Sequence, residues 1–188
     1  RLRDIPIVTF INKMDREAQD PFALLDEIAS KLALDPAPFY WPAGSGGRFK
    51  GMLDLRTQTF IPFSKNRDEG HPAPVAFDAD VMSTFLDPDE QAELEEASML
   101  VQGASKPFDP QAFLEGHMTP VIYGSALRHF GVDQLLDSLG AYAPPPGLRV
   151  VQKAGVDTHV APGDPEVTGF VFKVQANMDP NHRDRIAF

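Results

Sequence analysis

Two short apolar runs, each followed by a helical pattern, limit the fold of this chain more than any other feature. Residues 5–11 (IPIVTFI) and 119–123 (TPVIY) are rich in β-branched and aromatic side chains without polar alternation, which is typical of strands buried on both faces. A helix is expected over 21–33, because Asp20-Pro21 offers a cap with Pro at the first helical position. A second helix is expected after 131. Strands that alternate with helices predict an α/β fold with a parallel sheet.

The apolar side chains that we expect these two helices to turn inward follow a helical spacing. In the first helix they are Phe22, Leu25, Ile28 and Leu32, and in the second they are Val132, Leu135, Leu136 and Leu139. Prolines end the first helix, because Pro lacks the backbone N–H that a helix needs; they are Pro36, Pro38 and Pro42.

A longer mixed segment lies between the two strand–helix units. Residues 48–63 predict an antiparallel strand pair, a helix is expected from 87 to about 103, and a shorter one from 109. After 143 the chain is rich in Pro and Gly, as linkers are, and 167–188 alternates as β-strands do. We therefore expect an α/β domain with an inserted α+β subdomain, then a linker, then the start of a β domain.

The first apolar run stops at Asn12-Lys13-Met14-Asp15, which places an amide, an ammonium group and a carboxylate within one tetrapeptide. A carboxylate can accept hydrogen bonds from guanine N1–H and its exocyclic amino group together, so Asp15 would recognise the base. Asn12 can bond the N7 side of the base and tie neighbouring loops together, and the methylene stem of Lys13 can cover the purine face. Adenine would leave the carboxylate unpaired, so the motif predicts selectivity for guanine.

A second loop, Gly124-Ser125-Ala126-Leu127, follows the second apolar run in the same way. A tight turn there can aim a backbone N–H at guanine O6, while the Ser125 hydroxyl supports the Asp15 carboxylate. Ligands of α/β sheets bind at the carboxyl ends of strands, so we expect the two loops to meet in space. The candidate base site comprises Asn12, Lys13, Met14, Asp15, Ser125, Ala126 and Leu127.

These two loops, in this order and separated by an insertion, resemble the latter half of the G domain of the translational GTPases. The helical segment GVDQLLDSL after the second loop extends the resemblance. The chain is most similar to the branch of these GTPases that acts in peptide chain termination. The similar phrases are RLRDIPIVTFINKMDRE, QGASKPFD, FGVDQLLD and TGFVFKVQANMDPNHRDRIAF, and the resemblance covers essentially the whole chain.

The resemblance implies a division into domains. Residues 1–143 would be the C-terminal part of a P-loop-type G domain, with the inserted α+β subdomain at about 36–118. Residues 144–166 would be the linker, and 167–188 would hold the first strands of a β-barrel domain. The family's phosphate loop, switch segments and catalytic His would all precede Arg1. We therefore expect a fragment that is inactive alone and holds neither a catalytic residue nor a metal ligand.

The resemblance also implies partners and an activity for the full-length protein. Members of the family bind GTP or GDP with Mg²⁺ and hydrolyse GTP on the ribosome. This branch promotes the recycling of class I release factors, so the expected partners are a guanine nucleotide, the ribosome and class I release factors. Two alternatives stay open: a ribosomal GTPase like elongation factor G, and a non-catalytic ribosome- or protein-binding module with a vestigial base site. The phrase QANMDPNHRDRIAF tells against the first.

The other motifs are weak. AGSGGRFKG, at 43–51, has no Gly directly before its Lys and no Ser or Thr after it, so we interpret it as the approach to a hairpin rather than a phosphate loop. His182-Arg183-Asp184 lacks the other motifs of a kinase. The five His are too scattered for a zinc site, and the acidic run 87–96 is interpreted as a helix start.

The composition excludes several classes of protein. A net charge of −10 argues against general DNA or RNA binding, which needs a basic face. No apolar run is long enough to span a bilayer, so we expect no membrane association. The chain has no Cys, which fits a cytoplasmic location.

Overall fold

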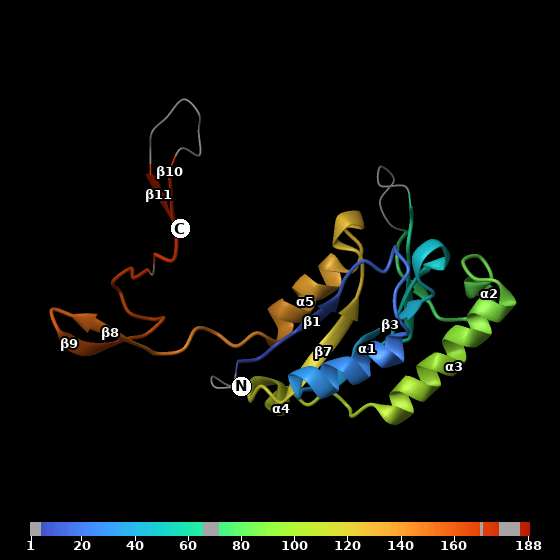
Figure 1. The fold of residues 1–188 in the computed structure, drawn as a ribbon, viewed down its shortest axis with the longest axis horizontal. Helices are drawn as coiled ribbons and strands as arrows, with labels where there is room; N and C mark the ends of the chain where they lie inside the picture. The colour runs from blue at the N-terminus through green and yellow to red at the C-terminus, as the bar shows by residue number, and fades with distance from the viewer. Residues whose placement is uncertain (1–4, 66–71, 170, 177–184) are drawn as a thin grey trace. The chain divides into compact units, whose positions relative to one another are not determined.

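The computed structural model describes residues 5–65, 72–169, 171–176 and 185–188. Two compact units make up the chain, Arg1–Pro144 and Pro145–Phe188. Figure 1 traces both. The first unit holds both of the loops proposed to form the base site.

The first unit contains a three-stranded parallel sheet. Its order is β1 (Thr9–Ile11), β7 (Met118–Tyr123) and β2 (Asp35–Pro38), and both outer strands run parallel to β7. The central strand β7 is buried along its whole length. The expected α/β fold with a parallel sheet is therefore confirmed.

The helices that follow β1 and β7 lie on the two sides of these strands (Figure 1). Helix α1 (Pro21–Glu27) is capped by the Asp20 carboxylate, which accepts from Ala23 N at 3.0 Å, and it continues into the π-helical turn η1 (Ile28–Leu32). Helix α5 (Val132–Tyr142) begins beside Phe10 of β1. Phe10 is paired with Ile122, and successive side chains of a strand face opposite sides of the sheet. Tyr123 therefore points to the side opposite Phe10, where its hydroxyl donates to the Pro21 carbonyl at 3.4 Å.

Three details of the strands differ from the sequence-based expectation. The strand expected over 5–11 is limited to β1, which is only half-buried, and Ile5 and Ile7 are 58% and 44% exposed. The reason is that, among the described residues, β1 is an edge strand that pairs with β7 alone. Strand β2 was not expected, because it contains Pro36 and Pro38. It lies at the opposite edge, where a residue without an N–H costs no ladder bond.

The inward faces of the helices also differ in part. Leu25 and Ile28 are buried as expected, but Leu32 at the end of η1 is 52% exposed. In α5 the buried side is formed by Leu135, Ser138 and Tyr142 rather than by Leu136 and Leu139; these two are 58% and 40% exposed. Both spacings are helical, so the periodicity alone could not decide which stripe faces the core.

The insertion between β2 and β7 builds a second, antiparallel sheet. Its strands are β3 (Tyr40–Ala43), β4 (Gly51–Asp54), β5 (Thr59–Pro62) and β6 (Val75–Ala76), paired in that order, with the 3₁₀ turn η2 (Gly46–Arg48) between β3 and β4. The expected strand pair within 48–63 is confirmed as β4 and β5.

Three helices complete the insertion: α2 (Ala79–Met82), α3 (Pro88–Ala104) and α4 (Pro110–Leu114). Both expected helices are confirmed as α3 and α4. Helix α3 starts with a capping box, in which the Asp87 carboxylate accepts from Glu90 N at 2.8 Å and the Glu90 carboxylate accepts from Asp87 N at 3.1 Å.

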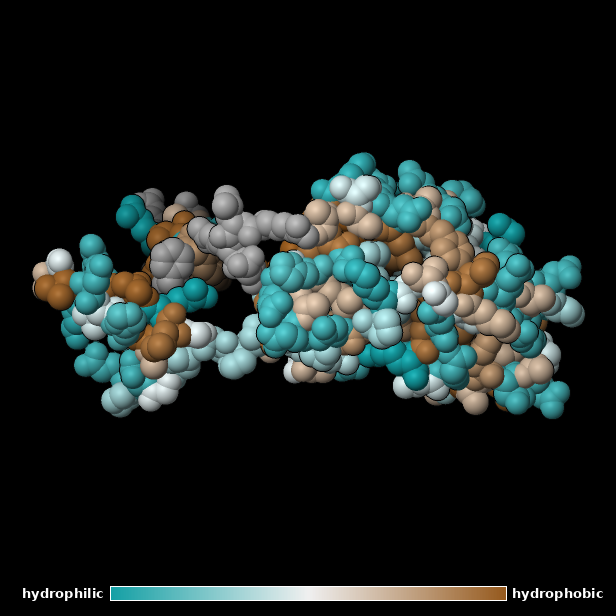
Figure 2. All heavy atoms as spheres, turned by 90° about the horizontal axis from the view of Figure 1, so that it is seen from below, coloured by the Kyte–Doolittle hydropathy of each residue, from teal (hydrophilic) through white to brown (hydrophobic). Residues whose placement is uncertain are grey.

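One continuous core joins the parallel sheet to the insertion. It is rich in aromatic side chains, which bury large apolar areas; fully buried examples are Tyr123, Phe39, Phe49, Phe60 and Phe130. On the face shown in Figure 2, polar and apolar residues are mixed over the surface of the first unit.

The second unit consists of two antiparallel hairpins among the described residues, β8 (Arg149–Lys153) with β9 (Val156–Val160), and β10 (Val174–Ala176) with β11 (Arg185–Ala187). The stretch 144–166, expected as a linker, thus contains regular structure. Ala154 and Gly155 both have positive φ, 54° and 80°, which is the geometry of a tight hairpin turn. His182-Arg183-Asp184 lies outside the described residues.

Candidate nucleotide-base site

Parallel pairing of β1 with β7 brings the two candidate loops to the same edge of the sheet. The register aligns Ile11 with Tyr123, the last residues of the two strands. The two strands therefore end side by side, and the loops that follow them start next to each other. The Gly124 N–H donates to the Ile11 carbonyl at 2.9 Å and extends the pairing by one bond.

Asn12 ties the two loops together. Its side-chain oxygen Oδ1 accepts one hydrogen bond from its own loop, from Lys13 N at 2.8 Å, and one from the other loop, from Ala126 N at 2.9 Å. The expectation that Asn12 ties neighbouring loops is confirmed. Lys13 adopts a left-handed backbone conformation, φ 69°, which turns the chain sharply after the strand.

Met14 anchors the same loop from inside the protein. Its side chain is fully buried, its N–H donates to the Gly124 carbonyl at 3.0 Å, and its own carbonyl accepts from Gly46 N at 2.9 Å. The sequence motif therefore combines an internal anchor, Met14, with exposed polar neighbours, Asn12 and Lys13.

Asp15 lies at the junction of the loops with its side chain 14% exposed. The carboxylate oxygen Oδ2 is 3.7 Å from Nε of Arg128, which belongs to the 3₁₀ turn η3 (Ala126–Arg128) after the second loop. Sequence reasoning missed Arg128. The sequence shows only that a cationic residue directly follows the Ser-Ala-Leu motif, and the motif does not indicate that Arg128 would pair with Asp15.

Ser125 does not support the Asp15 carboxylate, so that expectation is wrong. The residue is 1% exposed, and its hydroxyl oxygen has no hydrogen-bond partner among the described residues. The reason is that Ser125 is held through its backbone, by bonds of 3.0 Å in both directions with Phe130, which fix the turn with the hydroxyl buried. The Ala126 N–H, which could have faced guanine O6, is bonded to Asn12 instead.

The second loop is packed too closely to accept a side chain at Gly124. A Cβ there would overlap the Phe130 carbonyl oxygen and would lie 2.7 Å from Cζ of Phe10. Gly131, φ 78°, then starts α5. Ala126 and Leu127 are exposed, and Leu127 is 62% exposed, so the loop presents its last two residues to solvent.

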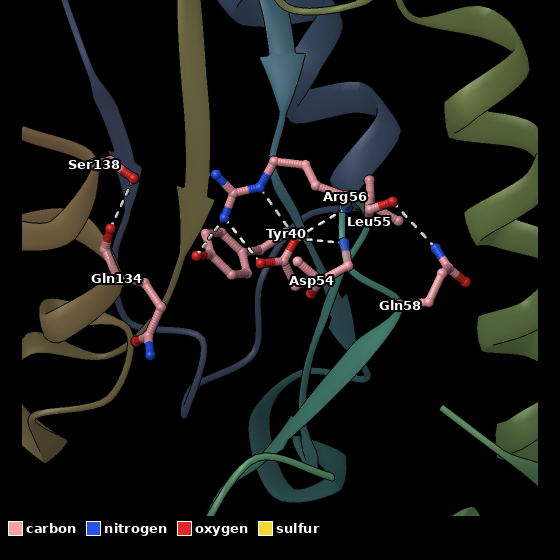
Figure 3. Close-up of polar contacts among 8 residues, drawn as sticks. Tyr40, Asp54, Leu55, Arg56, Gln58, Gln134 and Ser138 are labelled. Atoms are coloured by element: carbon pink, nitrogen blue, oxygen red, sulfur yellow. Dashed lines mark hydrogen bonds and ion pairs between the residues drawn. The ribbon is translucent and has the colours of Figure 1, made fainter. Parts of the chain in front are cut away.

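Figure 3 shows a second polar cluster, which is built from residues of the insertion. Asp54, which is 7% exposed, accepts two bonds from the Arg56 guanidinium at 3.1 and 2.8 Å, and Arg56 also donates to the Tyr40 hydroxyl at 2.8 Å. The guanidinium carbon lies 4.3 Å from the ring centroid of Phe39. Burial raises the pKa of Tyr40 to about 12, so the hydroxyl stays protonated. This cluster holds the turn between β4 and β5 and serves stability.

Two absences concern the described part of the chain. No three His, Asp or Glu side chains there come together as they would around a metal ion. Within the same residues, no helix has the length and apolar character needed to cross a bilayer.

In a comparison with protein families, residues 1–145 match the elongation factor Tu GTP binding domain. The chain belongs to this family. The match spans both loops of the candidate site and the insertion between them. It confirms the resemblance to the translational GTPases and the expected G-domain class of α/β fold.

Curated relatives carry a more specific name. The chain is 43% identical over 191 residues to peptide chain release factor 3 of Nitrosomonas eutropha, and 46% identical over 192 residues to that of Aromatoleum aromaticum. Each comparison covers 100% of this chain and 35% of the relative, so the chain spans about a third of the length of the relatives it matches.

One solved structure is similar in fold. A crystal structure of a protein from Thermus thermophilus matches with a TM-score of 0.50 at 18% identity, over 75% of this chain and 22% of that one. This likeness concerns the fold alone.

Proposed function

We propose that this chain supplies the guanine-recognising part of a translational GTPase. The full-length protein acts on the ribosome in translation termination and promotes the recycling of class I release factors. Two findings support the proposal: the chain belongs to a family of GTP-binding domains, and its curated relatives are named peptide chain release factor 3. A cytoplasmic location stays a prediction.

The observation that carries the proposal is the junction of the two loops. Asn12 bonds Ala126 across the carboxyl ends of β1 and β7, and Asp15 lies at the same junction with part of its carboxylate in solvent. A carboxylate in that position can accept two hydrogen bonds from the edge of a guanine. The exposed Lys13 is next to it and can cover a face of the base.

Leu127 joins the proposed base site through its position rather than through a polar group. It directly follows Ala126 and is exposed at the end of the loop, where an apolar side chain can pack on a purine ring. Met14 and Ser125 are buried, so we assign them the positioning of the loops rather than contact with the base.

The phosphates and Mg²⁺ would be bound elsewhere. The chain contains no Gly-x-x-x-x-Gly-Lys-Ser/Thr, and its described residues hold no set of metal ligands. Mg²⁺, when bound, would neutralise phosphate charge during GTP hydrolysis. Because these residues do not fit the metal, we derive no step of hydrolysis from them.

The names of the relatives favour the termination branch over a protein like elongation factor G. A binding experiment distinguishes the proposed function from the alternative of a non-catalytic module with a vestigial base site. The test measures binding of fluorescent GDP and ADP analogues to the full-length protein, meaning this chain with whatever its gene encodes on either side. Hydrolysis of GTP is measured in parallel, with and without ribosomes.

We expect the full-length protein to bind GDP at micromolar concentration or tighter and to reject ADP. The 188-residue chain alone should bind only at about millimolar concentration, because a few hydrogen bonds of about 0.5–1.5 kcal/mol each must offset the entropy of association. A full-length protein without preference for guanine would overturn the proposal. Tight, Mg²⁺-dependent binding by the chain alone would show that the phosphates bind within it.

A further inference from the structure

The peptide of Met14 is held between two loops that come from different parts of the fold. On one side its N–H donates to Gly124 of the second base loop, and on the other its carbonyl accepts from Gly46 of the insertion. The next residue is Asp15, the proposed base-reading residue. The position of the Asp15 backbone therefore depends on the insertion as much as on the parallel sheet.

The contact at Gly46 is close and conformationally demanding. Gly46 is buried and has φ 58°, in the left-handed region that favours glycine. A Cβ at this position would overlap the carboxylate of Glu17 and would lie 3.1 Å from the Glu17 backbone nitrogen. Gly46 thus lies directly against the chain that continues from Asp15.

Three phenylalanine rings make a second contact between the insertion and the base loops. Phe49 and Phe63, which flank β4 and β5, have their ring centroids 5.4 and 5.3 Å from that of Phe130, and 5.1 Å from each other. Phe49 and Phe130 are 2% and 1% exposed. Phe130 in turn holds the backbone of Ser125 through two hydrogen bonds of 3.0 Å. The insertion therefore supports both base loops, one through a hydrogen bond and one through aromatic packing.

We infer that the insertion positions the base-reading carboxylate, with Gly46 and Phe49 as positioning residues for guanine selectivity. This inference rests on the proposed function. Gly46 fixes the position of the Met14 carbonyl and thereby that of the next residue, Asp15. Phe49 packs on Phe130 and so fixes the conformation of the turn that contains Ala126, the hydrogen-bond partner of Asn12. The glycine-rich segment 43–51 has a role here that its resemblance to a phosphate loop did not indicate.

Selectivity rather than affinity is the property to measure. Inosine lacks the exocyclic amino group of guanine, so the ratio of GDP to IDP affinity reports how well the Asp15 carboxylate is placed. A hydrogen bond to a charged group corresponds to a preference of roughly tenfold to a hundredfold. Loss of folded protein lowers the amount of binding but leaves this ratio unchanged, whereas a displaced carboxylate lowers the ratio itself.

The experiment compares Gly46→Ala and Phe49→Leu with two matched controls in the full-length protein. Gly47→Ala is the control for the glycine, because a Cβ at Gly47 meets no atom within 4 Å. Phe60→Leu is the control for the ring, because Phe60 is fully buried in β5 of the same insertion and its ring packs on Phe85, at 6.0 Å between the ring centroids. Thermal unfolding of each variant identifies those that are folded, and competition with fluorescent GDP gives the affinities.

We expect Gly46→Ala and Phe49→Leu each to reduce the GDP-to-IDP ratio by about fivefold or more, and the two controls to keep the wild-type ratio. Two results would overturn the inference: folded Gly46→Ala and Phe49→Leu proteins with the wild-type ratio, or a ratio that falls equally in the controls. A wild-type protein with no preference for GDP over IDP would instead refute the proposed function, so the two failures are distinguishable.

Discussion

The side-chain oxygen of Asn12 accepts a hydrogen bond from the backbone N–H of Ala126 at 2.9 Å, although 114 residues of sequence separate them. This bond acts together with the backbone hydrogen bonds from Met14 N to the Gly124 carbonyl and from Gly124 N to the Ile11 carbonyl to hold two loops that are distant in the sequence. The bond lies at the carboxyl ends of two paired parallel strands, where α/β proteins bind ligands. The geometry around it should therefore be sensitive to substitutions in either loop.

Asn12→Ala should weaken binding of guanine nucleotides by about tenfold in the full-length protein. The change removes the acceptor of two backbone N–H groups, and a hydrogen bond is worth about 0.5–1.5 kcal/mol net. Competition with fluorescent GDP measures the effect. Gln19→Ala removes another exposed amide nearby and should leave the affinity unchanged; an equal loss in both variants would contradict a specific role for Asn12.

Asp15→Asn should shift the preference of the full-length protein from guanine toward xanthine nucleotides. Xanthine carries a carbonyl where guanine carries the amino group, and an Asn side chain can donate to that carbonyl. Competition between GDP and XDP tests the shift, with Asp26→Asn on the exposed side of α1 as the control. If Asp15→Asn keeps the wild-type order of the two nucleotides, Asp15 does not contact the base.

Gly124→Ala should destabilise the protein by about 1–3 kcal/mol, because the new Cβ would overlap the Phe130 carbonyl and press on the Phe10 ring. Gly140→Ala makes the same change in α5, where a Cβ meets no atom within 4 Å, and should stabilise by about 0.5–1 kcal/mol. Urea unfolding of both variants measures the two free energies. Opposite signs are expected, and a neutral Gly124→Ala would show that the loop can relax.

Tyr40 should make the free energy of unfolding decrease at high pH. Burial raises the pKa of Tyr40 from 10.0 to about 12 in the folded state. Below pH 10 the hydroxyl is protonated in both states, so the stabilisation is complete; between pH 10 and 12 the unfolded chain loses the proton first, and stability falls by about 2–3 kcal/mol. Burial also raises the pKa of Tyr123, which acts in the same direction.

Urea unfolding between pH 8 and 12 measures this dependence, and tyrosinate absorbance follows the ionisation. Tyr40→Phe should remove part of the decrease and leave the part due to Tyr123. If Tyr40→Phe loses as much stability as the wild type over the same range, the Tyr40 hydroxyl is not the responsible group.

The sequence by itself determined the local elements and the chemistry of the first loop. Apolar β-branched runs predicted the strands, Asp-Pro pairs predicted the starts of α1, α3 and α4, and the order of charged groups after residue 11 predicted a base-reading motif. These features depend on neighbours within a few residues, so the local sequence is enough to predict them.

Only the tertiary structure decided which faces and edges these elements present. Leu135 of α5 packs against the core as expected, whereas Leu136 and Leu139, which the spacing predicts on the same face, are exposed. Strand β2 forms despite two prolines because it lies at a sheet edge. The partners of the site residues, Arg128 for Asp15 and Gly46 for Met14, come from distant segments. Such contacts depend on how segments far apart in the sequence come together, and local propensity carries no information about that arrangement.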